Sequence, residues 1–188
     1  QVQWQQQGIS AVNIAVNLSA LQFHQPNLLE SVEKIINESG IEHGKLTLEI
    51  TESTLMEETD SLTAKLHALR SLGVNIAIDD FGTGYSSLAH LKRFPIKNLK
   101  IDQEFTRQLP YNQRDTAITR SIIKMAHELG ITVIAEGIEQ QDQLQFLKQT
   151  NCDLGQGYYL AEPMPSIEFT QWLNDYQQQN KNNIHSIQ

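Results

Sequence analysis

The sequence predicts an α/β fold in which parallel strands alternate with helices and curl into a barrel. Six short apolar, partly β-branched runs are separated by amphipathic stretches, which implies parallel strands joined by right-handed crossovers. Within each run, every second side chain is aliphatic, and the side chains between them are small or polar. Because helices cover both faces of a doubly wound sheet, its central strands should be apolar at both parities. We therefore favour a barrel with helices outside and a polar upper interior.

The expected elements follow from the pattern in chain order. Residues 61–73 and 115–130 carry apolar side chains at helical spacing and end in a glycine, which is typical of a helix and its C-terminal stop. The residues from 174 to 188 are rich in Gln and Asn and are expected to form a disordered tail after a domain spanning 1–173. The expected strands are 12–17, 46–50, 74–79, 99–102, 131–135 and, less clearly, 155–160.

Polar residues gather at the carboxyl ends of these strands. In a barrel the site lies at this end, because the strand ends and the loops that follow them meet there. We therefore expect these side chains to converge. They are Asn17, Glu49, Asp79, Asp80, Lys100 and Glu136.

Two adjacent carboxylates, Asp79 and Asp80, need a positive partner. At about 4 Å and an effective dielectric constant near 20, two such charges repel by about 4 kcal/mol. Alone, the pair is as typical of a turn or a helix cap, and Glu49 or Lys100 alone is more typical of a solvated residue. Together at equivalent strand ends, they indicate a divalent cation, and oxygen ligands favour Mg²⁺ or Mn²⁺ over zinc.

Composition excludes several classes of function. The net charge is −8 and no run of Lys or Arg is present, so binding to a nucleic-acid polymer is not expected. The lone Cys152 rules out an internal disulfide and fits a reducing compartment, with the cytoplasm as the default. No signal pattern or long apolar run suggests membrane contact by this segment. We expect Tyr158 and Tyr159 to lie in the core rather than at a barrel mouth.

Six sequence blocks carry a specific likeness, in the same order as in one known family. From about Trp4 to about Trp172, the chain resembles the EAL family of bacterial cyclic di-GMP phosphodiesterases. The resemblance implies a (β/α)8 TIM-type barrel that hydrolyses one phosphodiester of cyclic di-GMP to give linear pGpG, with Mg²⁺ or Mn²⁺ in a two-metal site. The blocks are VNLSALQF, LEITES, AIDDFGTGYSSL, LKIDQEF, VIAEGIE and DLGQGYYLAEPM.

The resemblance also implies a role for each strand-end residue. Asn17, Glu49 and Asp79 would be ligands of one metal ion. Asp79 would bridge to a second ion that Asp80 also holds and that Glu136 helps to hold.

Other roles follow from the same resemblance. Lys100 would orient or activate the attacking water, and Glu139 and Gln156 would support the metal waters and the substrate. Glu52 would anchor the loop at 80–87, which in this family helps to order the metal site and often borders a dimer contact. A homodimer is therefore expected.

One departure from the family pattern is large. The Glu-Ala-Leu motif that names the family should lie well upstream of Asn17, so two strands and one metal-ligand glutamate are expected to be missing. About six β/α units would then be present. The whole protein is expected to carry an upstream sensor or GGDEF-type domain, and the present segment leaves its membrane anchoring open.

Two hypotheses for the function are compatible with the sequence. The first is a metal-dependent phosphodiesterase, although the activity of this chain alone is in doubt without the upstream glutamate. The alternative is a catalytically inactive module that binds cyclic di-GMP and signals through partner domains. An enolase-like barrel with a lysine base is disfavoured, because its site does not call for an adjacent Asp pair followed by a glycine loop.

Overall fold

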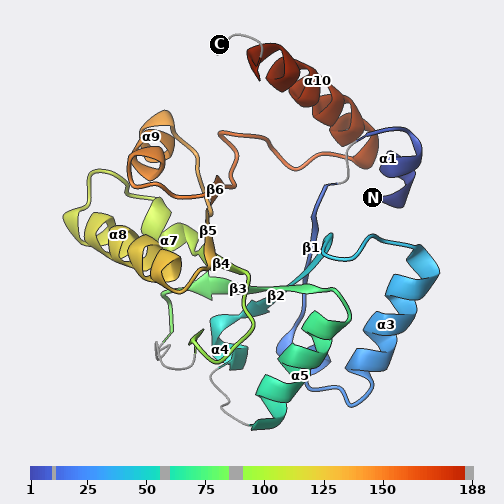
Figure 1. Ribbon diagram of the computed structural model, residues 1–188. Helices are drawn as coiled ribbons and strands as arrows, with labels where there is room; N and C mark the ends of the chain where they lie inside the picture. Colours follow the sequence, from blue (N-terminus) through green and yellow to red (C-terminus); the bar gives the residue numbers. More distant parts are fainter. Residues whose placement is uncertain (10–11, 56–59, 85–90, 185–188) are drawn as a thin grey trace.

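A computed structural model describes residues 1–184 except 10–11, 56–59 and 85–90. Six strands form one sheet in the order β1-β2-β3-β4-β5-β6, and every neighbouring pair is parallel. Because the spatial order follows the chain order without a reversal, the sheet is wound as in a barrel and not as in a doubly wound fold. Figure 1 shows it curled into a half-barrel, which confirms the predicted fold class. The strands are β1 (Ile14–Asn17), β2 (Leu46–Thr51), β3 (Asn75–Phe81), β4 (Asn98–Ile101), β5 (Thr132–Ala135) and β6 (Leu154–Gly155).

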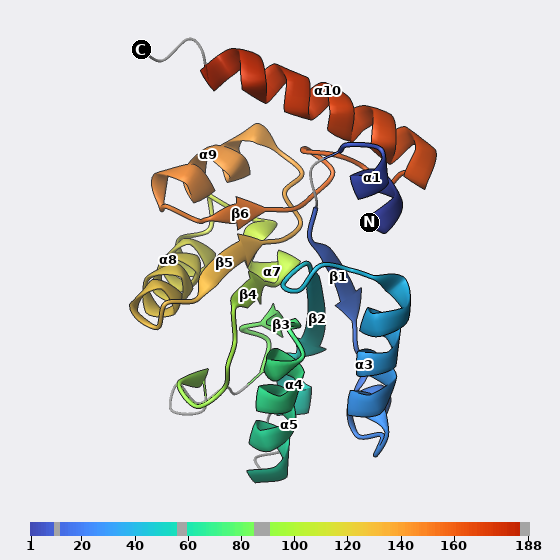
Figure 2. The same cartoon turned by 45° about the vertical axis from the view of Figure 1, so that its right-hand side comes forward.

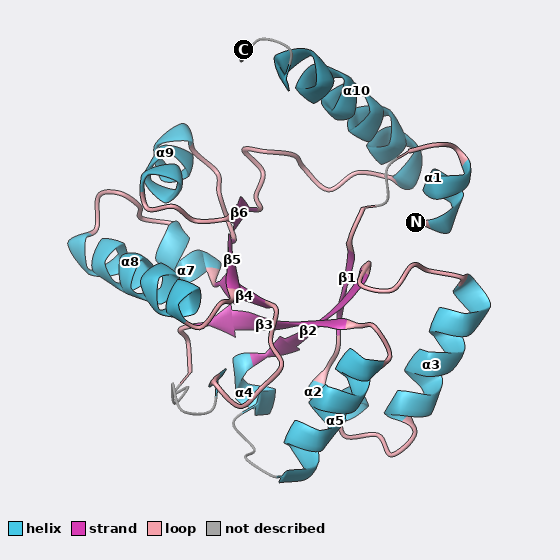
Figure 3. Ribbon diagram, viewed as in Figure 1, coloured by secondary structure: helices cyan, strands magenta, loops and turns pink. Residues whose placement is uncertain are grey.

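The helices α3, α5, α8 and α9 lie outside the curled sheet, as Figure 3 shows with helices in cyan and strands in magenta. Among the described residues, none of the helices has the length and apolarity that crossing a bilayer requires. The helices are α1 (Val2–Gln6), α2 (Ala20–Phe23), α3 (Leu28–Ser39), α4 (Glu52–Leu55), α5 (Asp60–Ser71), α7 (Gln103–Thr106), α8 (Gln113–Glu128), α9 (Gln141–Gln149) and α10 (Ser166–Ile184).

The core lies between the aliphatic face of the strands and the helices. Ile50, Ile76, Leu99 and Val133, one from each inner strand, are fully buried and belong to one apolar cluster with Leu66 of α5. Burying each such side chain contributes about 1.5–3 kcal/mol. The side chains that alternate with these core residues therefore face the inside of the half-barrel, as the sequence pattern predicts.

The two edge strands are more open than the four inner ones. Val16 on β1 is 45% exposed and Leu154 on β6 is 53% exposed. Strand β6 is also shorter than the expected 155–160, because the chain turns at Gly157, where an added Cβ would lie 2.2 Å from the carbonyl oxygen of Ile138. The expectation that Tyr158 and Tyr159 are core residues is wrong, since this turn leaves both exposed.

Helix α10 extends into the region expected to be a disordered tail. The backbone is helical through Ile184, and residues 185–188 lie outside the described part of the chain. Phe169, Trp172 and Tyr176 lie three and four residues apart and stack along one side of the helix. The ring of Trp4 on α1 packs on Phe169 with centroids 5.1 Å apart, and Figure 2 shows the two helices side by side. This packing, together with the good helix propensity of Gln, favours the helix as far as Tyr176.

Candidate functional site

Four side chains from neighbouring strands form a buried ion cluster. The ammonium of Lys100 on β4 donates to Glu49 of β2 at 2.8 Å, to Asp79 of β3 at 2.9 Å and contacts Glu136, just after β5, at 2.9 Å. We call these four residues the lysine cluster. Lys100 is 4% exposed. Burial lowers its pKa, but the hydrogen bonds to the three carboxylates outweigh burial and hold the pKa above its usual value.

Strand geometry brings the cluster together. The parallel strands end at the same edge of the sheet, and each member has the parity that faces the interior. The ladder continues one residue beyond β5, because the backbone N–H of Glu136 donates to the carbonyl of Ile101 at 3.1 Å. This extra bond fixes the backbone from which the Glu136 side chain projects.

The adjacent aspartates reach the same space because the strand is irregular there. Neighbouring residues of a regular strand point to opposite faces, but the register between β3 and β4 shifts between Ile78 and Phe81, and Asp80 has a φ of 55°. This left-handed conformation is uncommon for a residue other than glycine and turns Asp80 back toward Asp79. One carboxylate oxygen from each of Asp79, Asp80 and Glu136 lies within 4.8 Å of the other two.

The site is rich in negative charge. Burial, the neighbouring Asp79 and then Asp102 raise the pKa of Asp80, and burial raises the pKa of Glu136 even though Lys100 opposes it. One ammonium faces four carboxylates, which favours a further cation at this position. All available donors are oxygen atoms, the ligands that hard divalent cations prefer.

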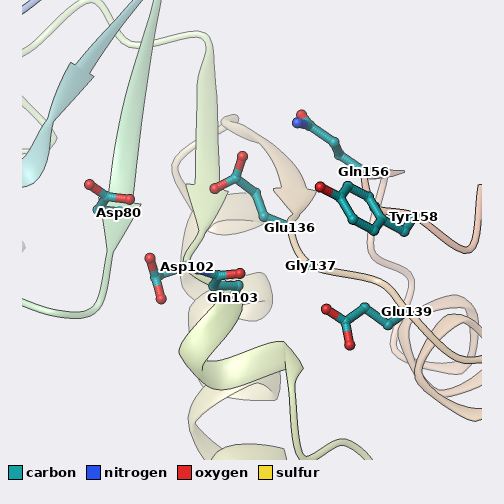
Figure 4. Close-up of a pocket in the computed structure, with 9 residues that line it drawn as sticks. Asp80, Asp102, Gln103, Glu136, Gly137, Glu139, Gln156 and Tyr158 are labelled. Carbon is teal, nitrogen blue, oxygen red and sulfur yellow. The ribbon is translucent and has the colours of Figure 1, made fainter. Parts of the chain in front are cut away.

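A cavity of about 370 Å³ opens beside the lysine cluster. Figure 4 shows Glu136 pointing between Asp80 on one side and Gln156 with Tyr158 on the other. Acidic and amide groups therefore surround a polar space that favours cations. The lining residues are Asp80, Asp102, Gln103, Glu136, Gly137, Glu139, Gln156, Gly157 and Tyr158.

Comparison with known families decides the assignment of the chain. The sequence profile of the EAL domain matches residues 1–163. The chain belongs to the EAL domain family. It is 44% identical over 163 residues to the bifunctional diguanylate cyclase/cyclic di-GMP phosphodiesterase MucR of Pseudomonas aeruginosa, covering 87% of this chain and 24% of MucR. It spans about a fifth to a quarter of the length of curated relatives such as MucR.

Solved EAL structures share the fold. The PaMucR phosphodiesterase in its c-di-GMP complex has a TM-score of 0.85 and 42% identity, covering 89% of this chain and 68% of that one. Klebsiella pneumoniae BlrP1 in a manganese and cyclic di-GMP complex has a TM-score of 0.74 and 31% identity, covering 82% of this chain and 40% of that one. These matches support the family resemblance that the sequence blocks indicated.

The structure of this EAL domain separates the expected site residues into three groups. Glu49, Asp79, Asp80, Lys100 and Glu136 lie together in or beside the lysine cluster. Glu139 and Gln156 line the cavity, and Asn17 lies opposite Glu49 in the strand register but is exposed at the open edge.

The expected loop anchor, Glu52, is buried below the glycine loop of this EAL domain. Its Oε2 atom accepts hydrogen bonds from the backbone N–H of Gly82 at 2.9 Å and of Gly84 at 3.2 Å. A Cβ at Gly84 would lie 2.9 Å from the Glu52 carboxylate, so the loop approaches Glu52 as closely as glycine allows. The functional part of this assignment stays a prediction, and residues 85–87 of the loop lie outside the described residues.

Among the side chains that line the cavity, the sequence pattern indicated no functional role for Asp102 or Gln103, and Tyr158 was expected in the core. A signal was available for Asp102, which has the same parity as Lys100 and lies just past the end of β4. It also caps helix α7 by accepting from the N–H of Glu104 at 2.6 Å, and capping is the commoner explanation for such an aspartate. The position of Tyr158 depends on the turn at Gly157, which no periodicity predicts.

Proposed function

We propose that this chain forms the main part of a domain that hydrolyses cyclic di-GMP to linear pGpG. The observation that carries the proposal is the lysine cluster with Asp80 at the strand ends of an EAL domain. The name of MucR and the c-di-GMP complex of PaMucR supply the substrate class. The reaction consumes one water: its oxygen bonds to phosphorus, and the bond between that phosphorus and the 3′ oxygen breaks.

Two divalent ions, Mg²⁺ or Mn²⁺, fit the oxygen donors of the site. Asn17, Glu49 and Asp79 would hold one ion, and Asp79 with Asp80 and Glu136 would hold the other. The close approach of the last three carboxylates supports this assignment, as does the manganese complex of BlrP1. When bound, such a pair supplies Lewis acidity at the reacting phosphate.

The protein side chains supply position and charge. Lys100 holds three carboxylates in a fixed arrangement, and one of its N–H groups would orient the attacking water when a cation shares those carboxylates. Glu139 and Gln156, on the far wall of the cavity, would support the metal waters and the substrate. Glu49 and Lys100 are buried and paired with each other, so they need little rearrangement as charge develops.

The surroundings of the domain are also part of the proposal. The chain covers 24% of MucR, whose name states a second, diguanylate cyclase activity, so we place an upstream sensor or GGDEF-type domain in the same polypeptide. We further propose a homodimer with its contact bordering the glycine loop, and a location in the cytoplasm, where cyclic di-GMP is made and used.

The test is incubation of the intact protein with cyclic di-GMP and Mg²⁺, Mn²⁺ or Ca²⁺, followed by chromatography of the nucleotides. We expect pGpG with Mg²⁺ or Mn²⁺. With Ca²⁺ we expect binding without turnover, because its looser coordination disturbs the tight geometry that hydrolysis needs. Stoichiometric binding with no cleavage under any ion would favour the inactive signalling module instead.

A further inference from the structure

Gln143, in the first turn of helix α9, is an almost fully buried amide, with 2% of its surface exposed. Its Oε1 atom accepts hydrogen bonds from the backbone N–H of Glu139 at 2.7 Å and of Gln140 at 2.9 Å. Its Nε2 atom donates to the backbone carbonyl of Arg107 at 3.1 Å. An amide side chain has two acceptor sites and two donor hydrogens, so three of these four are used on backbone groups.

A capping role explains only one of these bonds. Gln140 is the N-cap of α9, and the reciprocal pair of bonds between Gln140 and Gln143 is a capping box. Glu139 lies before that cap, and Arg107 follows α7, 36 residues earlier in the chain. A capping box also works on an exposed helix and does not require burial. The two additional bonds therefore need a further explanation.

Gln143 connects the two walls of the cavity. One wall is the loop 136–139, which carries Glu136 and Glu139, and the other is the first turn of α7, which carries Gln103. The walls touch at Gly137, whose φ of 66° and close approach to Gln103 leave no room for a Cβ. Gln143 adds a second attachment, because its donor bond reaches the carbonyl of Arg107, the residue that follows α7. Two points of attachment fix an orientation that one point leaves free to rotate.

The loop is tightly held on its other side as well. Ile138 is fully buried in a small apolar cluster with Phe146 of α9, and its N–H donates to the carbonyl of Gln156 at 3.1 Å. The neighbouring Glu139 N–H has the Gln143 amide as its partner. Loss of this amide would leave a backbone N–H of the cavity wall without its bond, and the loop would then shift to find water or another acceptor.

We propose that Gln143 is a positioning residue that braces the loop 136–139 against α7 and so sets where Glu136 and Glu139 lie relative to Asp102. Its effect on rate rests on the proposed phosphodiesterase function. Its effect on the geometry of the cavity does not depend on that function, which allows the two proposals to be tested separately.

The kinetic test compares two substitutions in the intact protein. Gln143→Met keeps the length of the side chain and removes all three hydrogen bonds, whereas Gln143→Glu keeps the acceptor oxygens and loses the donor. We expect kcat to fall by about 10- to 100-fold in the methionine variant and by less in the glutamate variant. We also expect a higher Mn²⁺ concentration for half-maximal activity and a KM for cyclic di-GMP within about threefold of wild type.

Thr150→Val is the matched control at the other end of α9. The Thr150 hydroxyl donates to the carbonyls of Phe146 and Leu147, so the variant loses helix hydrogen bonds far from the cavity wall. We expect its Tm to fall while kcat stays within about twofold of wild type. If Gln143→Met retained wild-type kcat, or lost no more than Thr150→Val at a matched Tm, the brace would be refuted. Should the methionine variant not fold, Gln143→Glu carries the same comparison.

Hydrogen exchange measures the brace without substrate. The backbone amides of Glu139 and Gln140 should exchange at least about tenfold faster in Gln143→Met, which removes their acceptor. They should stay closer to wild type in Gln143→Glu, which keeps the acceptor oxygens, and should be unchanged in Thr150→Val. If the wild-type protein did not cleave cyclic di-GMP, the proposed function would fail, and exchange would still decide the positioning role. Unchanged exchange at Glu139 would overturn it, whatever the activity.

Discussion

The inner strands β2 to β5 and the edge strands β1 and β6 contribute differently to the same site. Glu49, Asp79 and Lys100 on the inner strands are largely covered and joined by short ion pairs. Asn17 on β1 and Gln156 after β6 are exposed. The charged centre is therefore assembled by residues that satisfy one another inside the sheet, whereas the two edge residues remain accessible to solvent.

Asp79→Asn should have the largest effect on activity. The substitution removes a carboxylate assigned to both ions and bonded to Lys100, so we expect hydrolysis in the intact protein to fall by at least about 10³-fold. Binding of cyclic di-GMP should survive in part, because the loss falls mainly on the transition state. Product chromatography and calorimetry measure the two effects, with the exposed Glu38→Gln as control. Turnover within a few-fold of wild type would contradict the two-metal assignment.

Lys100→Met should separate charge balance from metal binding. Three carboxylates lose their counter-charge, and we expect the metal-free protein to lose about 3 kcal/mol of unfolding free energy and about 10²-fold or more of its activity. Saturating Mn²⁺ should raise the Tm of the variant by more than that of wild type, because the ion replaces the missing positive charge. Chemical denaturation with and without Mn²⁺ measures both. Unchanged unfolding free energy of the metal-free variant would show that Lys100 does not balance the charge of the three carboxylates.

Asn17→Ala tests the edge directly. The side chain is exposed and serves only one of the two proposed ions, so we expect activity to fall by about 10- to 100-fold, less than for Asp79→Asn, with almost no change in Tm. Raising the Mn²⁺ concentration should restore part of the rate. A loss as large as that of Asp79→Asn would break the distinction between inner and edge residues.

Glu52→Ala should act through the glycine loop and not through ligation. Loss of the carboxylate removes the acceptor of the Gly82 and Gly84 N–H groups, and we expect activity to fall by about tenfold. Gly84→Ala should lower activity similarly, because its Cβ would lie against Glu52. A crystal structure of the Glu52 variant with the described part of the loop unmoved would disprove the anchor role.

Asp153→Asn should have the smallest effect of these substitutions. Asp153 lies immediately before the edge strand β6, at the end of the strand away from the site. Partial burial would raise the pKa of Asp153, but hydrogen bonds from the Val133 N–H and from His127 outweigh it and hold the pKa below its usual value. A lowered folded-state pKa stabilises the fold above the unfolded pKa of about 3.9, and this stabilisation is lost as the pH falls through the folded value.

We therefore expect Asp153→Asn to cost less than about 1 kcal/mol at pH 7, since the side chain is over a third exposed. Denaturation from pH 2 to pH 7 checks this, with Asp175→Asn as control. The difference from wild type should shrink to nothing at the acid end. A difference that grew toward low pH would have the wrong sign for this account.

The fold and the inner half of the site could be predicted because both depend on strand parity. Parity alone puts Glu49, Asp79 and Lys100 on one face, and the parallel order makes their strand ends coincide. The conformation of Asp80 could not be predicted, because a strand pattern does not show a positive φ. The residues that line the cavity could not all be predicted for a similar reason, because their positions depend on the conformation of turns.

Gln143 and helix α10 were missed for opposite reasons. Gln143 occurs in the run QQDQLQ, where nothing local distinguishes a buried amide from its exposed neighbours. Its role depends on Arg107, far away in the sequence. In α10 the polar composition after residue 173 drew attention away from Phe169, Trp172 and Tyr176, which have helical spacing. Phe169 packs on Trp4, which lies near the other end of the sequence.

The contact between α1 and α10 gives the domain an intrinsic optical probe. Trp4 and Trp172 are the two tryptophans of this sequence, and both rings contact Phe169. The Trp4 indole N–H also donates to the hydroxyl of Thr170 at 2.8 Å. Emission from these two tryptophans should therefore report whether α1 and α10 remain together. It should change little when an ion enters the lysine cluster. Separation of α1 from α10 could thus be followed by fluorescence in real time, while product formation reports independently on the active centre.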